Sequence, residues 1–248
     1  VLDCLRKYCW HMMRWYFMKN INLFQLTKRI IVFLAGLLII QTGVAIFIQT
    51  SIGADPFTIF TTGIARLLHT NVGNANLLLS ILFTLVIIAV FREWKQINIG
   101  TVMALMFAGV CINLMNRVIM PLSLGSFPVP VRLCFVVISC ILIAAGFSME
   151  KACDLGVAPN DLFILIFTDK TKLEYRFVRI GIDLTFLTVG FLLCGVDTFG
   201  STLGFGTVLN ALIQGPLIQF FMERVEKVIK PVIASDGTKK QIAEGSEE

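Results

Sequence analysis

Two segments far apart in the sequence combine a helix breaker with acidic or amide side chains. The first reads Gly53-Ala54-Asp55-Pro56, and the second reads Gly156-Val157-Ala158-Pro159-Asn160-Asp161. Aspartate followed by proline is typical of a helix start, with aspartate as the N-cap and proline in the first turn. The unbonded N–H groups and partial positive charge of such a start suit an anion or another polar solute. Both segments are therefore candidate solute-binding elements, and two ordinary loop-to-helix caps are the alternative.

Asp183 is a further candidate, because it lies inside an otherwise apolar window over residues 177–196. Arg179 precedes it by four residues, so the two side chains share a helix face and can form an ion pair. An ionisable group inside an apolar helix is a candidate functional site. The alternative is a shallow pair near the end of the helix, since seven helical residues rise only about 10 Å.

A second set of polar side chains lies within two other apolar windows. Asn113 belongs to the window over residues 99–119, and Asn210 and Gln214 belong to the window over residues 203–222. Such residues either line the path of a solute or form hydrogen bonds between helices, each worth about 1 kcal/mol. Both interpretations stay open at this point.

These residue types indicate binding and not catalysis. His11 and His69 are the only histidines, which excludes a His-Glu-x-x-His zinc site and most histidine-based triads. The sequence contains no Walker-type loop and no Cys-x-x-Cys or Cys/His cluster for a metal. We therefore expect no enzymatic activity, no catalytic residue, no metal and no cofactor.

The helices that carry these residues must lie in a lipid bilayer. The 248 residues are 56% hydrophobic and only 15% charged, with a mean hydropathy of +0.83, whereas a soluble domain has about 45–50% apolar and about 25% charged residues. A membrane-spanning helix needs about 20 apolar residues. Six windows approach that length: 30–50, 74–91, 99–119, 131–149, 177–196 and 203–222. The composition predicts an all-α, polytopic membrane protein.

The net charge of +5 fits a membrane topology and does not require a nucleic-acid partner. Basic residues gather before the first window and after the last one, so both termini are expected in the cytoplasm. We divide the chain into a cytoplasmic N-terminal segment (1–29), two membrane segments (30–119 and 131–224) and a cytoplasmic tail (225–248).

The two membrane segments repeat one pattern. Gly43, Gly53 and Pro56 match Gly146, Gly156 and Pro159 at one constant offset. Further on, Ile99-Gly100-Thr101-Val102 recurs as Phe205-Gly206-Thr207-Val208. Ordered matches of this kind indicate an internal duplication. Each half then consists of a long span, a breaker, a short apolar segment and two more long spans.

The two short apolar segments, 57–68 and 159–168, decide the topology. If neither crosses the bilayer, the protein has six spans plus two half-helices, and its halves have opposite orientations. If both cross, it has eight spans and its halves have the same orientation. Counting charges gives no preference, whereas the length of the segments favours six spans.

The pattern resembles the YczE/YyaS/YitT group of bacterial integral membrane proteins, in its YczE-like branch. The resemblance rests on Gly53-x-x-Pro56 and on the run Gly206-Thr207-Val208-Leu209-Asn210-Ala211-Leu212-Ile213-Gln214-Gly215-Pro216-Leu217-Ile218, and it covers about residues 30–224. It implies a multi-pass protein of the bacterial inner membrane. It supplies neither a substrate nor functional residues.

The residues themselves predict a small secondary transporter or permease, with a site for a small polar or anionic solute between the two halves. The alternative is a non-transporting membrane scaffold or regulatory partner. A homodimer or a membrane protein partner, besides the lipid bilayer itself, fits either interpretation.

Overall fold

All regular structure in the described part of the chain is helical, which confirms the all-α prediction. The computed structural model describes residues 23–70, 72–194 and 204–233. Its α-helices are α2 (Leu23–Gln49), α3 (Pro56–Leu67), α4 (Val72–Ala89), α5 (Ile99–Ile119), α6 (Val129–Ala152), α7 (Pro159–Thr171), α8 (Tyr175–Cys194) and α9 (Phe205–Ile233). Three short 3-10 turns, η1 (Trp94–Gln96), η2 (Met120–Leu122) and η3 (Leu124–Ser126), complete the described links. Most of the expected N-terminal segment and C-terminal tail lies outside the described residues.

Four of the described helices are long and apolar enough to cross a bilayer. They are α2, α5 with its extension to Leu122, α6 and α9. The other two predicted windows coincide with α4 and α8, which have 18 and 20 residues. The helical membrane class is therefore confirmed, whereas the number of six crossings stays a prediction.

The two short apolar segments form short helices that begin at their prolines. Helix α3 has 12 residues and α7 has 13. At about 1.5 Å per residue, neither reaches the roughly 30 Å of a hydrocarbon core.

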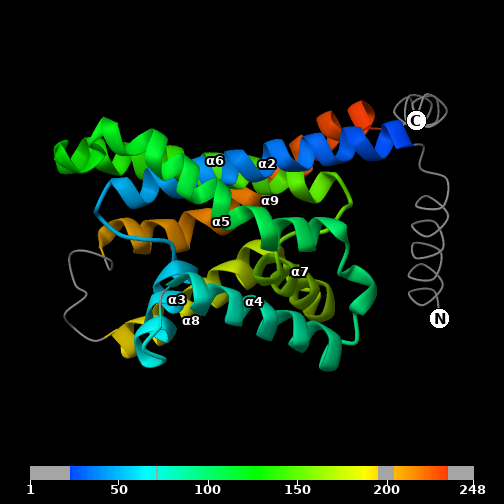
Figure 1. Ribbon diagram of the computed structural model, residues 1–248, viewed down its shortest axis with the longest axis horizontal. Coiled ribbons are helices and arrows are strands. Elements are labelled where there is room, and N and C mark those ends of the chain that lie inside the picture. The colour runs from blue at the N-terminus through cyan, green and yellow to red at the C-terminus, as the bar shows by residue number, and fades with distance from the viewer. Residues whose placement is uncertain (1–22, 71, 195–203, 234–248) are drawn as a thin grey trace.

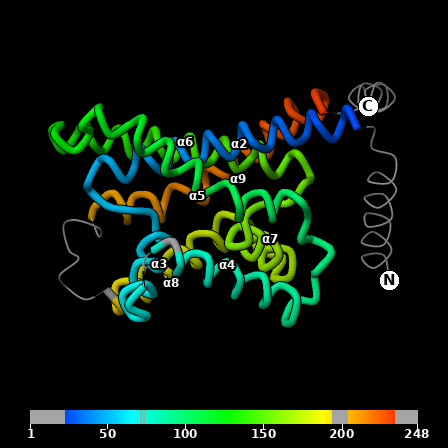
Figure 2. Tube along the Cα trace, viewed as in Figure 1, coloured from blue at the N-terminus to red at the C-terminus, as the bar shows by residue number. Residues whose placement is uncertain are grey.

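The helices form two layers (Figure 1). Helices α2, α6 and α9 run side by side along the long axis, with α5 against α2, and the second layer contains α3, α4, α7 and α8. The chain trace in Figure 2 shows how the layers connect: the link after α2 descends to α3 at one end, and the link after α6 descends to α7 towards the other. Contacts between α8 and α9 join the layers.

Polar contacts gather the helix ends into two groups. At one end, Arg29 near the start of α2 donates to the carbonyl of Cys153 after α6 (3.3 Å). At the other end, Arg132 at the start of α6 donates to the carbonyl of Thr50 after α2 (3.3 Å). Helices α2 and α6 are therefore antiparallel.

Small residues bring α2 and α6 into backbone contact. A Cβ atom on Gly146 of α6 would lie 2.6 Å from the carbonyl oxygen of Gly36 in α2. Such small-residue contacts are typical of helix packing in bilayers, where close approach of the backbones replaces the hydrophobic effect. Further along α6, Phe147 packs with Tyr175 of α8 and Ile218 of α9 in the largest buried cluster. This packing fixes the positions of the helices that carry the candidate site.

Candidate functional site

The two breakers are bound in the same way to the start of a helix distant in sequence. The carbonyl oxygen of Ile52 accepts from the amide of Gly206 in α9 (3.2 Å). Likewise, the carbonyl oxygen of Leu155 accepts from the amide of Gly100 in α5 (2.7 Å). The first breaker thus docks on the start of α9, and the second breaker docks on the start of α5.

Both predicted breaker glycines, Gly53 and Gly156, have a backbone conformation that disfavours a side chain. Their φ angles are 151° and 100°. A Cβ atom would lie 2.5 Å from the hydroxyl oxygen of Thr207 at Gly53, and 2.6 Å from that of Thr101 at Gly156. The Thr207 hydroxyl oxygen accepts from the amide of Ala54 (3.1 Å), whereas the buried Thr101 hydroxyl has no hydrogen-bond partner within the described ranges.

Asp55 and Pro56 start α3 as the sequence predicts. One carboxylate oxygen of Asp55 accepts from the amide of Thr58 (2.9 Å), and the other accepts from the hydroxyl of Thr58 (2.6 Å). Pro56 lies in the first turn of α3, as Pro159 does in that of α7. The N-cap prediction is confirmed, and the positive N-terminus of α3 faces the chain's own carboxylate.

Two substitutions distinguish the capping role of Asp55 from the role of its negative charge. Asp55→Ala removes the acceptor and is expected to lower the free energy of unfolding by about 0.5–2 kcal/mol. Asp55→Asn keeps an acceptor of similar strength and should change it by much less. Unfolding of the detergent-solubilised protein, followed by circular dichroism, measures both. Equal losses for the two variants would contradict a capping role.

Arg179 of α8 holds two carboxylates from two helices. It forms an ion pair with Asp161 in the first turn of α7 (2.7 Å) and with Asp183 one turn further along α8 (2.9 Å). The three side chains are largely buried, with 13%, 17% and 2% of their surface exposed for Arg179, Asp161 and Asp183. The pair of Arg179 and Asp183 is confirmed, and the structure adds Asp161 to it.

Asp55, the N-cap of α3, also lies near these ion pairs. The carboxylate of Asp183 lies within electrostatic range of both Asp55 and Asp161. The starts of α3 and α7 therefore both lie near Asp183 of α8. We call Asp55, Asp161, Arg179 and Asp183 the charged cluster.

Sequence reasoning missed Glu150, which lies near the C-terminal end of α6. The residue is 1% exposed, its Oε1 atom has no hydrogen-bond partner within the described residues, and its carboxyl lies within electrostatic range of Asp161. The carbon atoms of its side chain pass Gly36 of α2, where a Cβ atom would lie 3.3 Å from its Cγ. The available signal was its position: it directly follows the window 131–149 and lies six residues before Gly156.

The predicted amide residues separate into different environments. Asn210 is 2% exposed, and its Nδ2 atom donates to Sγ of Cys140 in α6 (3.4 Å), which fits the interhelical interpretation. Gln214 is 1% exposed, and neither atom of its amide has a described partner. Asn160 is half-buried in the first turn of α7. Asn113 is exposed on α5 and is not brought to the charged cluster.

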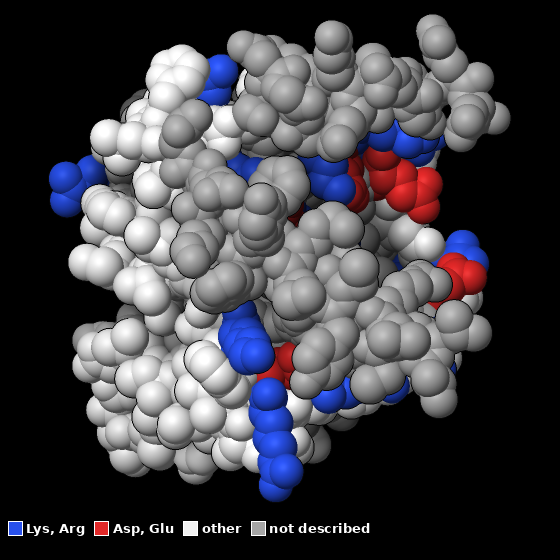
Figure 3. Space-filling view, turned by 90° about the vertical axis from the view of Figure 1, so that its right-hand side faces the viewer, with Lys and Arg blue, Asp and Glu red and all other residues white. Residues whose placement is uncertain are grey.

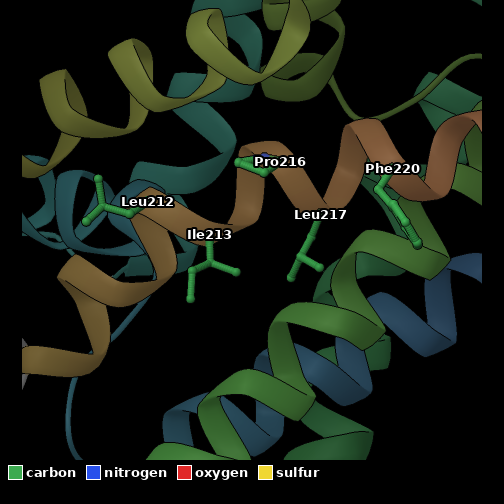
Figure 4. A pocket seen from close by; sticks show the side chains of 5 residues that line it. All are labelled: Leu212, Ile213, Pro216, Leu217 and Phe220. Carbon is green, nitrogen blue, oxygen red and sulfur yellow. The ribbon is translucent and has the colours of Figure 1, made fainter.

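A groove on α9 lies apart from these charges. It has a volume of about 380 Å³, and Figure 4 shows its lining of Leu212, Ile213, Pro216, Leu217 and Phe220. All five side chains are apolar, so the groove suits hydrocarbon and offers nothing to a polar solute.

Comparisons with known proteins give a family but no activity. A model of a family of unknown function, DUF6198, matches residues 27–223. An uncharacterised protein of Haemophilus influenzae is 26% identical over 206 residues, which cover 81% of this chain and 86% of that protein.

Two proteins of Bacillus subtilis match to a similar degree, which confirms the resemblance to YczE and YyaS. The uncharacterised membrane protein YczE is 26% identical over 211 residues (85% of this chain, 93% of that protein). The uncharacterised protein YyaS is 27% identical over 192 residues (77% and 91%). No solved structure matches the chain.

Proposed function

The chain belongs to the family of unknown function DUF6198, and we propose that it is a small secondary transporter. Because the family supplies no activity, the proposal rests on the chain's own residues. The solute site lies at the charged cluster, between the starts of α3 and α7. The chain is a membrane protein, as its long apolar helices and its relative YczE indicate.

The observation that carries this proposal is the meeting of charged side chains from three helices in the protein interior. Asp161 of α7 and Asp183 of α8 share Arg179, and Asp55 at the start of α3 lies within electrostatic range. Ionisable groups in membrane helices are costly and are therefore concentrated at solute and ion pathways. Helix starts exposed by broken helices form the solute site in many secondary transporters.

The internal repeat is part of the proposal. It is supported by the matching hydrogen bonds of the two breakers, Ile52 with Gly206 and Leu155 with Gly100. In each pair, a breaker of one half contacts the start of the last helix of the other half. A small movement at one breaker would therefore displace a helix of the opposite half, as alternating access requires.

Six crossings with two half-helices agree best with the arrangement of the helix ends. In Figure 1, the start of α2, the link from α4 to α5, the end of α6 and the end of α9 lie at one end of the molecule. The ion pair between Lys170 and Glu93 adds the end of α7 to this group (3.1 Å). An even number of crossings would place both termini on one side of the membrane.

Basic residues support a cytoplasmic orientation of that end. Figure 3 views this end and shows Lys and Arg at several points around it. The segments gathered there carry most of the described lysines and arginines: Lys28, Arg29, Arg92, Lys95, Lys151, Lys170, Lys172, Arg176, Arg224, Lys227 and Lys230. By the positive-inside rule, we infer an inner-membrane protein of a bacterium with both termini in the cytoplasm.

Cysteine accessibility tests the transporter proposal without knowledge of the solute. In a background from which the seven cysteines are removed, Ala54→Cys and Ala158→Cys place a thiol beside each half-helix start. Alternating access predicts that a membrane-impermeant maleimide labels both positions in intact cells and also in inverted vesicles. The readout is the fraction of protein labelled.

Two further cysteines provide the controls. Leu78→Cys, on an exposed apolar face of α4, should be labelled in neither preparation. Lys172→Cys, at the exposed link between α7 and α8, should be labelled only in inverted vesicles. Protection of Ala54→Cys and Ala158→Cys in both preparations would overturn the transporter proposal, and it would favour the non-transporting scaffold with a dry interface.

A further inference from the structure

The charge at the proposed site is negative and not positive. A helix N-terminus by itself attracts anions, but here a carboxylate of the chain lies at each start. Asp55 caps α3, and Asp161 lies in the first turn of α7, where it pairs with Arg179. A further anion at either start would therefore meet a like charge.

The acidic groups outnumber the basic one at the cluster. Asp183 lies within electrostatic range of both Asp55 and Asp161, and Glu150 lies within range of Asp161. Arg179 is the guanidinium that pairs with two of these carboxylates. Arg29 of α2 donates to the carbonyl of Cys153 and forms no ion pair with Glu150 in the described residues. The three aspartates therefore carry more negative charge than the single guanidinium of Arg179 compensates.

Glu150 provides an independent indication of where that charge binds. Only 1% of the residue is exposed, and its Oε1 atom accepts no hydrogen bond in the described structure. A buried carboxyl oxygen without a hydrogen-bond donor is unfavourable, and the N–H group of a bound ammonium ion would supply that donor.

Aromatic rings next to the cluster indicate an organic cation and not a bare metal ion. Phe186 lies three residues after Asp183, on the same face of α8. Its ring lies 5.7 Å from that of Phe57 in α3, with the distance measured between ring centroids. Both rings contact Phe83 of α4, with centroid distances of 6.2 Å for Phe57 and 6.0 Å for Phe186. Rings beside carboxylates are the usual environment of ammonium groups with organic substituents.

We propose that the solute of this site is an organic ammonium cation, bound between the carboxylates of the charged cluster and Glu150 and lined by Phe57 and Phe186. The inference rests on the proposed function only in calling this ligand the transported solute, because the binding site itself does not depend on transport.

Thermal unfolding of the purified full-length protein in a neutral detergent tests the proposal, with choline and tetraethylammonium chlorides as the probes. A saturating probe is expected to raise the melting temperature by about 5 °C, relative to sodium chloride at the same concentration. Sodium benzoate, an organic anion of similar size, should give no increase. Glu150→Gln and Asp55→Asn should each weaken binding at least about tenfold, and Phe186→Leu should weaken it less.

Glu174→Gln is the matched control, because this side chain is 53% exposed and pairs with Arg176 outside the cluster; it should leave the increase unchanged. An increase with benzoate but not with either ammonium salt would overturn the proposal, as would no increase with either salt or an unchanged increase in both Glu150→Gln and Asp55→Asn.

Labelled breaker cysteines without ammonium binding would leave the transporter proposal standing and reject the cation. Ammonium binding with protected cysteines would retain the cation site and reject transport.

Discussion

Replacement of Arg179 by methionine is expected to lower the free energy of unfolding by about 3–5 kcal/mol. The guanidinium is 13% exposed and forms ion pairs with Asp161 and Asp183. Methionine has a comparable length but no charge, so both carboxylates would remain buried without a counter-charge. An uncompensated buried charge costs far more than the net contribution of the ion pair. Chemical unfolding in detergent measures the loss.

A matched variant on the same helix serves as the control. Arg176 pairs with Glu174, and both side chains are about half exposed; Arg176→Met should therefore cost less than about 1 kcal/mol. Combining Arg179→Met with Asp161→Asn and Asp183→Asn removes all three charges and should recover much of the loss. If Arg179→Met costs no more than Arg176→Met, the cluster is not a buried ion-pair network.

Gly53→Ala is the second substitution with a large expected effect, a loss of about 2–4 kcal/mol. The positive φ of 151° disfavours a side chain. The new Cβ atom would also lie 2.8 Å from the backbone nitrogen of Thr207, which cannot move without displacing the start of α9. Gly156→Ala should cost less, because its closest neighbour is the hydroxyl of Thr101 at 2.6 Å and the Thr101 nitrogen lies at 3.3 Å.

The same substitution at Gly109 isolates the effect of position. A Cβ atom there meets nothing within 4 Å, and alanine is favoured over glycine inside a helix by about 1 kcal/mol. We expect melting temperatures in the order Gly109→Ala, Gly156→Ala, Gly53→Ala, from highest to lowest. A Gly53→Ala protein as stable as Gly109→Ala would show that the first breaker is not docked on α9.

Local features of the fold could be predicted well because they depend on neighbours in the chain. The helix starts at Pro56 and Pro159 and the cap formed by Asp55 need only a few adjacent residues. The pair of Arg179 and Asp183 needs only one helical turn. Helix ends were less accurate: α2 begins at Leu23 and α9 continues to Ile233, beyond the predicted windows, because amphipathic ends extend past the apolar run.

The orientation of helices about their axes could not be predicted. In a soluble helix, the apolar face identifies the side that packs on the protein. In a bilayer, the lipid-facing side is also apolar, so this signal is weak. For that reason Asn113 was a candidate although it is exposed on α5, and Glu150 was missed although it is buried between helices.

The amino-acid sequence by itself determined the membrane class, the two short helices and the glycine–proline breakers, because composition, length and capping are local properties. Only the tertiary structure decided which charges meet. Asp55, Asp161 and Asp183 come from three helices, and Glu150 comes from a fourth; their approach depends on close contacts such as Gly36 with Gly146 and Gly53 with Thr207. The net charge at the half-helix starts depends on that packing, because it is the sum of charges on residues that are distant in the sequence.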